Sequence, residues 1–220
     1  MLESRFPRIP GDIGNPVTWP FPVRYRIVTG ASPDRVVRGG AAGLLETFIE
    51  AGRELAADGV AGITTSCGFL ASMQQALADA IPVPVAASSL VQIGMIERLL
   101  PPGRRCGILT IAASCLSAAL LDAAGVSADT PIGSTEGGAE FTRAILDDEA
   151  QLDVALARQD NIEAALDLQA RHPEVAAIVL ECTNMAPYAA DIAGATGLPV
   201  YSVDTFVRWF QAGLRPRRFD

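Results

Sequence analysis

Two cysteines, Cys67 and Cys182, occupy equivalent positions in two copies of one sequence pattern. Residues 60–85 align without a gap on residues 175–200, and nine of the 26 aligned positions are identical. A thiol has an ordinary pKa of about 8.5, so it can serve as an acid or as a base near neutral pH. Two matched thiols on opposite sides of one cleft would suit a reaction that removes a proton from one face of a carbon and returns it to the other.

In each copy an apolar run precedes the cysteine and a helical pattern follows it, which places the thiol where a parallel strand ends and a helix begins. That edge is where open α/β sheets bind ligands. Unpaired backbone N–H groups at a helix start stabilise a thiolate and lower its pKa, and they stabilise the oxyanion formed beside a carboxylate. The substrate-binding groups expected around the two cysteines are those of Ser66, Gly68, Phe69, Thr183 and Asn184.

Strand and helix patterns alternate along the chain, which predicts an α/β fold with parallel sheets. Strands are predicted at 1–4, 25–29, 60–65, 83–86, 105–110, 130–134, 176–180 and 198–203. Helices are predicted at 35–55, 68–80, 88–100, 114–124, 139–156, 161–171 and 205–214. The break at Pro101-Pro102-Gly103 divides the chain into two pseudo-symmetric half-domains. Residues 1–100 with 204–220 are predicted to form the half that contains Cys67, residues 101–203 the half that contains Cys182, and the active site is expected in the cleft between them.

The composition excludes several classes of function. The net charge of −8 argues against nucleic acid or an anionic membrane as a partner. All 17 basic residues are arginine, which excludes a lysine Schiff base and a P-loop lysine. The single histidine, His172, argues against a zinc site, so neither a cofactor nor a metal is expected. Four cysteines without a CxxC pair and an N-terminus without a signal pattern predict a protein of the reducing cytoplasm.

The segments TTSCGFL and LECTNM, within duplicated halves, resemble those of the aspartate/glutamate/hydantoin racemase superfamily. The resemblance implies that Cys67 and Cys182 act as acid and base without a cofactor on a small carboxylate or amino acid. It implies polar strand ends near each cysteine loop, for which Ser4 and Thr110 are the nearest equivalents. A homodimer is also common in this family. Thr183 matches the usual Cys-Thr pair and is expected to bind carboxylate.

The sequence departs from the family pattern around both cysteines. Gly68-Phe69 replaces the usual Asn-Thr, Asn184 replaces the usual His, and Glu181 stands where many members have Gly. Because neighbouring strand residues point to opposite faces, Glu181 is expected to point away from the cleft; an inward carboxylate would oppose thiolate formation.

Elsewhere, the proline-rich start of the chain is interpreted as a loop from which Arg5, Arg8 or Asp12 reaches the cleft. Cys106 and Cys115 are interpreted as packing residues.

The favoured hypothesis is a cofactor-independent racemase or epimerase acting at the α-carbon of an amino acid or related acid. A second keeps the fold and changes the reaction to decarboxylation of a malonate-type acid or to cis-trans isomerisation of a diacid. Phe69 near the first thiol favours decarboxylation, and retention of both thiols favours racemisation. A third hypothesis is a protein that binds small acids without catalysis.

Overall fold

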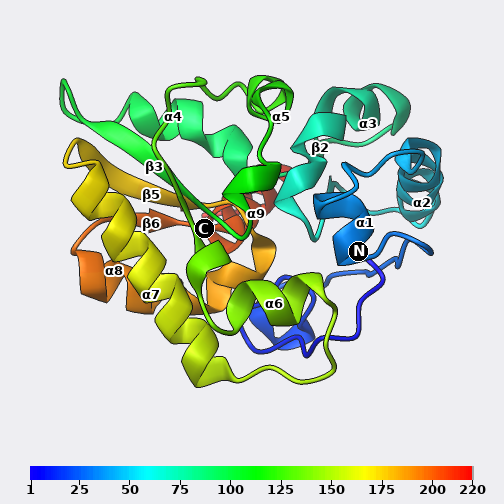
Figure 1. Cartoon of the computed structure of the whole chain (residues 1–220). Helices are drawn as coiled ribbons and strands as arrows, with labels where there is room; N and C mark the ends of the chain where they lie inside the picture. Colours follow the sequence, from blue (N-terminus) through cyan, green and yellow to red (C-terminus); the bar gives the residue numbers. More distant parts are fainter. Residues whose placement is uncertain (220) are drawn as a thin grey trace.

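The computed structural model describes residues 1–219, and its strands form two parallel sheets. The larger sheet has the order β4-β3-β5-β6 (Figure 1). Its strands are β3 (Arg105–Thr110), β4 (Ile132–Ser134), β5 (Val175–Leu180) and β6 (Val200–Tyr201). β3 and β5 are almost completely buried because they are continuous apolar runs covered on both faces. Both strands agree closely with the sequence prediction, which confirms the α/β class with parallel sheets.

The smaller sheet contains only β1 (Ile63–Thr64) and β2 (Val85–Ala86). The strands predicted at 1–4 and 25–29 are reduced to one isolated parallel bridge between Leu2 and Val28. Prolines at 7, 10, 16, 20 and 22 lie between these two segments, and each removes a backbone donor that a sheet needs. The N-terminal stretch is therefore a loop held mainly by side chains. The proposed division into 1–100 with 204–220 and 101–203 remains a prediction, and residue 220 lies outside the described part.

Helices surround both sheets. They are α1 (Pro33–Val37), α2 (Leu45–Ala57), α3 (Gln74–Ala80), α4 (Ile93–Glu97), α5 (Ala118–Ala123), α6 (Phe141–Leu146), α7 (Val154–Arg171), α8 (Ala189–Thr196) and α9 (Val203–Leu214). Short 3-10 turns are η1 (Pro16–Thr18), η2 (Gly68–Met73), η3 (Ser89–Gln92), η4 (Ala113–Cys115), η5 (Thr135–Gly137) and η6 (Thr183–Tyr188). In Figure 1, α7 and α8 lie together beside the larger sheet, and α2 and α3 lie together at the opposite end of the molecule.

The helix predicted across 139–156 is wrong in its extent: α6 ends at Leu146, and α7 begins at Val154. Asp153 caps α7 by accepting hydrogen bonds from the N–H groups of Ala155 and Leu156. Within α7, the buried Asp160 accepts hydrogen bonds from three N–H groups that precede or begin α6. Asp160 therefore joins α7 to the start of α6, across the break between the two helices.

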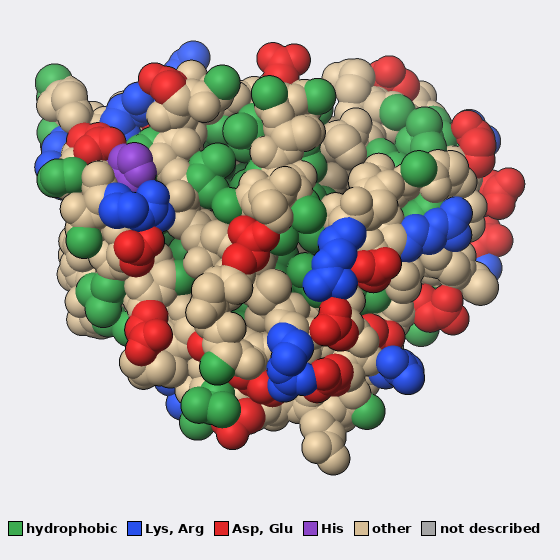
Figure 2. All heavy atoms as spheres, viewed as in Figure 1, with side chains coloured by type: hydrophobic (Ala, Val, Ile, Leu, Met, Phe, Trp, Pro, Cys, Tyr) green, Lys and Arg blue, Asp and Glu red, His purple; other side chains and the backbone are tan. Residues whose placement is uncertain are grey.

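The surface carries mixed charge. Figure 2 shows acidic and arginine side chains interspersed on the face it displays. Several arginines form ion pairs with nearby carboxylates, as Arg105 does with Glu97 and Asp129. None of the helices in the described residues has the length and apolar character needed to cross a membrane.

Candidate active site

The two cysteines lie at equivalent structural positions. Cys67 follows β1 by three residues and is the N-cap of η2; Cys182 follows β5 by two residues and is the N-cap of η6. Both have extended backbone angles, as N-cap residues usually do. The sequence predicted α-helical starts here, whereas the structure places a 3-10 turn after each thiol.

Both thiols line one small cavity of about 20 Å³. That volume accommodates roughly one water molecule. The other residues that line it come from segments far apart in the chain: Leu2, Phe6, Pro33, Val37, Ser66, Phe69, Ile111, Ile145, Leu146, Glu181 and Asn184. Cys67 is 7% exposed and Cys182 is 8% exposed. The geometry therefore brings together, on one small cavity, the two thiols that the sequence paired.

Burial dominates the electrostatics of the thiols. Burial first, and the nearby Glu181 carboxyl second, raise the pKa of Cys67 to about 12. The N–H groups of Phe69 and Leu70 and the guanidinium of Arg8 act in the opposite direction. The pKa of Cys182 is also well above its ordinary value, first because of burial, then because of Glu181 and Cys67. The expected lowering of the thiol pKa is therefore wrong for this closed pocket: desolvation outweighs the backbone donors, and both thiols are neutral at rest.

Glu181 points into the site, contrary to the expectation that it would turn away. Its side chain is fully buried and lines the cavity. One carboxyl oxygen, Oε2, accepts a hydrogen bond of 2.8 Å from Thr110 Oγ1, and the N–H of Ile111 also bonds the carboxyl. The other oxygen, Oε1, has no hydrogen-bond partner in the described chain. β5 ends at Leu180, so the alternation of strand faces no longer applies at residue 181.

The close fit around Glu181 explains the glycine after the first cysteine. A Cβ atom at Gly68 would overlap both Oε1 and the backbone oxygen of Glu181. Gly68 therefore has a steric role against the second cysteine loop. The pKa of Glu181 is raised to about 7, because burial outweighs the hydrogen bonds from Thr110 and Ile111.

The remaining predicted site residues divide into two groups. Ser66, Phe69 and Asn184 line the cavity, whereas Ser4, Gly68, Thr110 and Thr183 do not. Thr110 is engaged with Glu181, and Thr183 Oγ1 donates a 2.8 Å hydrogen bond to the carbonyl oxygen of Ser66. This bond joins the two cysteine loops directly. The roles predicted for these residues toward a substrate remain predictions.

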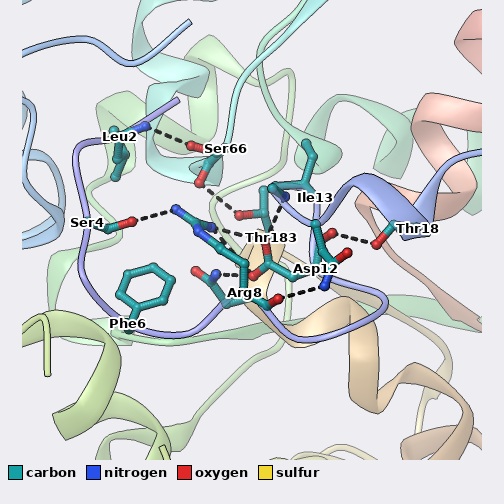
Figure 3. Close-up of polar contacts among 12 residues, drawn as sticks. Leu2, Ser4, Phe6, Arg8, Asp12, Ile13, Thr18, Ser66 and Thr183 are labelled. Carbon is teal, nitrogen blue, oxygen red and sulfur yellow. Dashed lines mark hydrogen bonds and ion pairs between the residues drawn. The ribbon is translucent and has the colours of Figure 1, made fainter. Parts of the chain in front are cut away.

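The N-terminal loop covers the site through a network of polar contacts (Figure 3). Arg8 lies at its centre: Nη1 bonds Asp12 Oδ1 at 3.1 Å, and Nη2 bonds Ser4 Oγ at 2.9 Å. Asn184 Nδ2 donates to Asp12 Oδ2 at 2.5 Å, and the Cys182 thiol donates to Asn184 Oδ1 at 3.6 Å. A continuous chain of contacts therefore runs from the second thiol to Arg8.

Two further features of this loop matter for binding. The Arg8 guanidinium carbon lies 4.4 Å from the centre of the Phe6 ring, and its buried Nε has no partner among residues 1–219. The loop is fastened to the first cysteine segment by a 2.9 Å hydrogen bond from the N–H of Leu2 to Ser66 Oγ. Of the three residues predicted to reach the cleft from this loop, Arg8 and Asp12 join the network, whereas Arg5 is exposed and pairs with Asp148.

The other residues considered from sequence lie outside this cavity. Cys106 is buried in β3, and Cys115 ends the η4 turn. His172 follows α7 and contacts Glu174. In residues 1–219 there is no cluster of three or more His, Cys, Asp or Glu side chains able to hold a metal ion.

Comparison with known proteins identifies similar sequences and similar folds. No family model matches this chain. It is 29% identical to a dimethylsulfoniopropionate lyase from Durusdinium sp. clade D, over 95% of this chain and 73% of that protein. It is 27% identical to dimethylsulfoniopropionate lyase 7 from Emiliania huxleyi, over 97% of this chain. The chain spans 65% of the length of that second relative.

Solved structures with the same arrangement include allantoin racemase from Klebsiella pneumoniae, with a TM-score of 0.59 and 20% identity over 77% of this chain and 65% of that one. Arylmalonate decarboxylase has a TM-score of 0.53 and 18% identity, over 82% and 80% of the two chains. A putative Asp/Glu racemase from Yersinia pestis has a TM-score of 0.53 and 14% identity, over 78% and 73%. This chain shares its fold with allantoin racemase and arylmalonate decarboxylase.

Proposed function

We propose that this chain is a lyase in which a cysteine removes the α-proton of a small carboxylate that carries a leaving group on its β-carbon. The observation that carries the proposal is the pair of thiols on one cavity, in a chain similar along its length to dimethylsulfoniopropionate lyases. Dimethylsulfoniopropionate, or a related β-sulfonium acid, is the proposed substrate. The similarity in sequence moves the favoured reaction from racemisation to elimination.

The proposed step uses one thiolate as its base. The thiolate takes the α-proton, the C–H electrons form a carbon–carbon double bond, and the bond from the β-carbon to sulfur breaks with its electron pair on sulfur. A β-sulfonium propionate would give propenoate, a neutral sulfide and one proton. Negative charge develops on the substrate carboxylate as the proton leaves, and fixed donors stabilise such charge by several kcal/mol.

Cys67 is the better candidate for the base. Two backbone N–H groups and the Arg8 guanidinium favour its thiolate. Glu181 opposes both thiolates, but Cys182 receives only one backbone N–H, from Asn184, and is opposed by Cys67 and Asp12 as well. Cys67 is therefore proposed as the base, and Cys182 as a neutral thiol on the other side of the substrate.

Arg8 is the proposed anchor of the substrate carboxylate. It is a cation beside the cavity with 14% of its side chain exposed, and its buried Nε is an unused donor within residues 1–219. The cavity holds about one water molecule, so a substrate must enlarge it. The N-terminal loop, which carries Phe6 and Arg8, is the proposed moving part, because it lies over the site and is fastened by a few side-chain bonds.

Racemisation at the α-carbon is the second candidate, because equivalent thiols from repeated segments line one cavity. The two functions differ in what they require of Cys182. Elimination needs one base, whereas racemisation needs both an acid and a base on opposite faces.

The test compares wild type with Cys67→Ser and Cys182→Ser. We expect wild type to release a volatile sulfide and propenoate from dimethylsulfoniopropionate, measured by gas chromatography and NMR. Cys67→Ser should lose about a thousandfold in kcat or more, because a hydroxyl is a much weaker base than a thiolate. Cys182→Ser should retain a measurable part of the activity. Cys106→Ser is the matched control and should leave kcat unchanged.

Absence of elimination by wild type, together with α-deuterium exchange into amino acids that both single variants abolish, would favour racemisation instead. Equal and complete loss of elimination in both variants would contradict the unequal roles proposed for the two thiols.

A further inference from the structure

A cysteine in this pocket can act as a base only after its thiol has lost a proton. Burial favours the neutral form of both thiols, and each cysteine is less than a tenth exposed. A thiolate formed after the pocket has closed on a substrate must give its proton to a group inside the pocket. Among the residues that line the cavity, the titratable side chains are Cys67, Cys182 and Glu181. The neutral Cys182 is no better a base than Cys67, which leaves the carboxyl.

The position of the carboxyl fits that task. Oε2 accepts a 2.8 Å hydrogen bond from Thr110 Oγ1, which orients the carboxyl, and the backbone of Ile111 also favours its ionised form. Oε1 is buried, has no partner in the described chain, and lies against the backbone of Gly68, the residue after Cys67. A buried oxygen without a donor is costly, and a proton on that oxygen would relieve the cost.

We propose that Glu181 is the proton partner of Cys67: its carboxylate holds the single negative charge of the pocket at rest and takes the thiol proton during turnover. This proposal rests on the lyase function proposed above. The proton moves from Cys67 Sγ to Glu181, which leaves a thiolate and a neutral carboxylic acid. The thiolate then takes the α-proton of the substrate and becomes a thiol again. Glu181 returns its proton to solvent when the pocket opens, so each turnover releases one proton.

The charges around Glu181 support this assignment. The carboxyl lines the cavity with the two thiols and its charge acts on both, while Arg8 and Asp12 of the N-terminal loop act on Cys67 and Cys182 respectively. No cation in residues 1–219 forms an ion pair with Glu181. The burial that raises the pKa of this carboxyl to about 7 lets it exchange a proton near neutral pH.

A distinctive pH dependence follows. While Glu181 holds the negative charge, moving the proton from Cys67 to Glu181 leaves the net charge unchanged, so the thiolate fraction no longer depends on external pH. The rate in wild type should rise tenfold per pH unit up to about pH 7 and then become level. In Glu181→Gln no internal acceptor remains, and the thiolate must form by losing its proton to solvent. Its rate should keep rising tenfold per pH unit between pH 7 and 9.

The test measures two rates against pH in wild type and Glu181→Gln. One is kcat for elimination. The other is alkylation of Cys67 by iodoacetamide, followed by mass spectrometry of the peptide that contains Cys67, and it requires no substrate. Thr110→Val is the second variant: it removes a bond that stabilises the ionised carboxyl, so the point where the wild-type curve levels off should move to higher pH.

A level region in wild type that is absent in Glu181→Gln supports the proposal, even if every compound tested as a substrate fails. Identical profile shapes in wild type and Glu181→Gln, in the alkylation assay, would overturn it whatever the size of the rates. Absence of elimination in wild type with the expected alkylation profiles would overturn the proposed reaction alone.

Discussion

At the scale of single residues, the site depends on which side chains share the space between the two cysteine loops. Glu181, Thr110 and Gly68 form one packed unit there: the carboxyl bonds Thr110, and Gly68 has only hydrogen where another residue would have Cβ. The Gly68-Phe69 departure from the usual Asn-Thr is thus matched by the Glu181 departure from Gly. The two substitutions make sense together, because a side chain at 68 and a carboxyl at 181 would occupy the same volume.

The first prediction concerns this contact. Gly68→Ala should lower the free energy of unfolding by about 2 kcal/mol or more, because overpacking in a rigid site costs that much. Glu181→Ala in the same chain should restore only part of the loss, since the new Cβ also meets the Glu181 backbone oxygen. Urea unfolding of both single variants and the double variant measures the effect. Gly194→Ala, at a position with open space around it, is the control. If the changes in unfolding free energy of the two single variants simply add in the double variant, the contact between Gly68 and Glu181 is contradicted.

At the scale of elements, β3 and β5 could be predicted closely because buried parallel strands are continuous apolar runs. The 3-10 turns after Cys67 and Cys182 could not, because 3-10 and α starts differ in hydrogen-bond spacing and not in apolar pattern. The contact of Asp12 with Asn184 joins residues 172 apart in the chain, and no local pattern encodes it. The pairing of Cys67 with Cys182 could be predicted because the two cysteines occupy equivalent positions in a sequence repeat.

The second prediction concerns Asp160, which binds three N–H groups at the start of α6 from inside α7. Asp160→Ala should lower the free energy of unfolding by about 2–4 kcal/mol, because it leaves several buried donors without partners. Asp153→Ala removes the exposed cap of α7 and should cost only about 1 kcal/mol. Thermal and urea unfolding of the two variants compares them. Equal losses would show that the link between α6 and α7 contributes little.

At the scale of the whole molecule, stability should depend on pH through Glu181. The pKa of Glu181 is about 7 in the folded chain, above the ordinary glutamate value of 4.5. Below about pH 4.5 the group is neutral in both states and has no effect. Between pH 4.5 and 7 the unfolded chain ionises first, so folding stability falls as pH rises, and above pH 7 the loss is constant.

The third prediction is therefore that Glu181→Gln is more stable than wild type at pH 8, by an amount on the order of 3 kcal/mol. The difference should shrink steadily between pH 7 and 5 as the wild-type carboxyl becomes protonated. Urea unfolding at pH 5, 6, 7 and 8 measures it, and the comparison cancels the contributions of the other ionisable groups. A difference that stays constant across this range would show that the carboxyl does not titrate there.

The two sheets that carry the cysteines are unequal. β1 and β2 have two residues each, whereas β3 and β5 have six each and lie between further strands. Fewer backbone bonds make a region easier to unfold locally while the rest stays native. Local unfolding should thus occur more readily in the segment around Cys67 than in the segment around Cys182. Amide hydrogen exchange would be fast around residues 60–66 and slow in 175–180. The segment around Cys67 would then move to admit a small molecule, while the segment around Cys182 stayed in place.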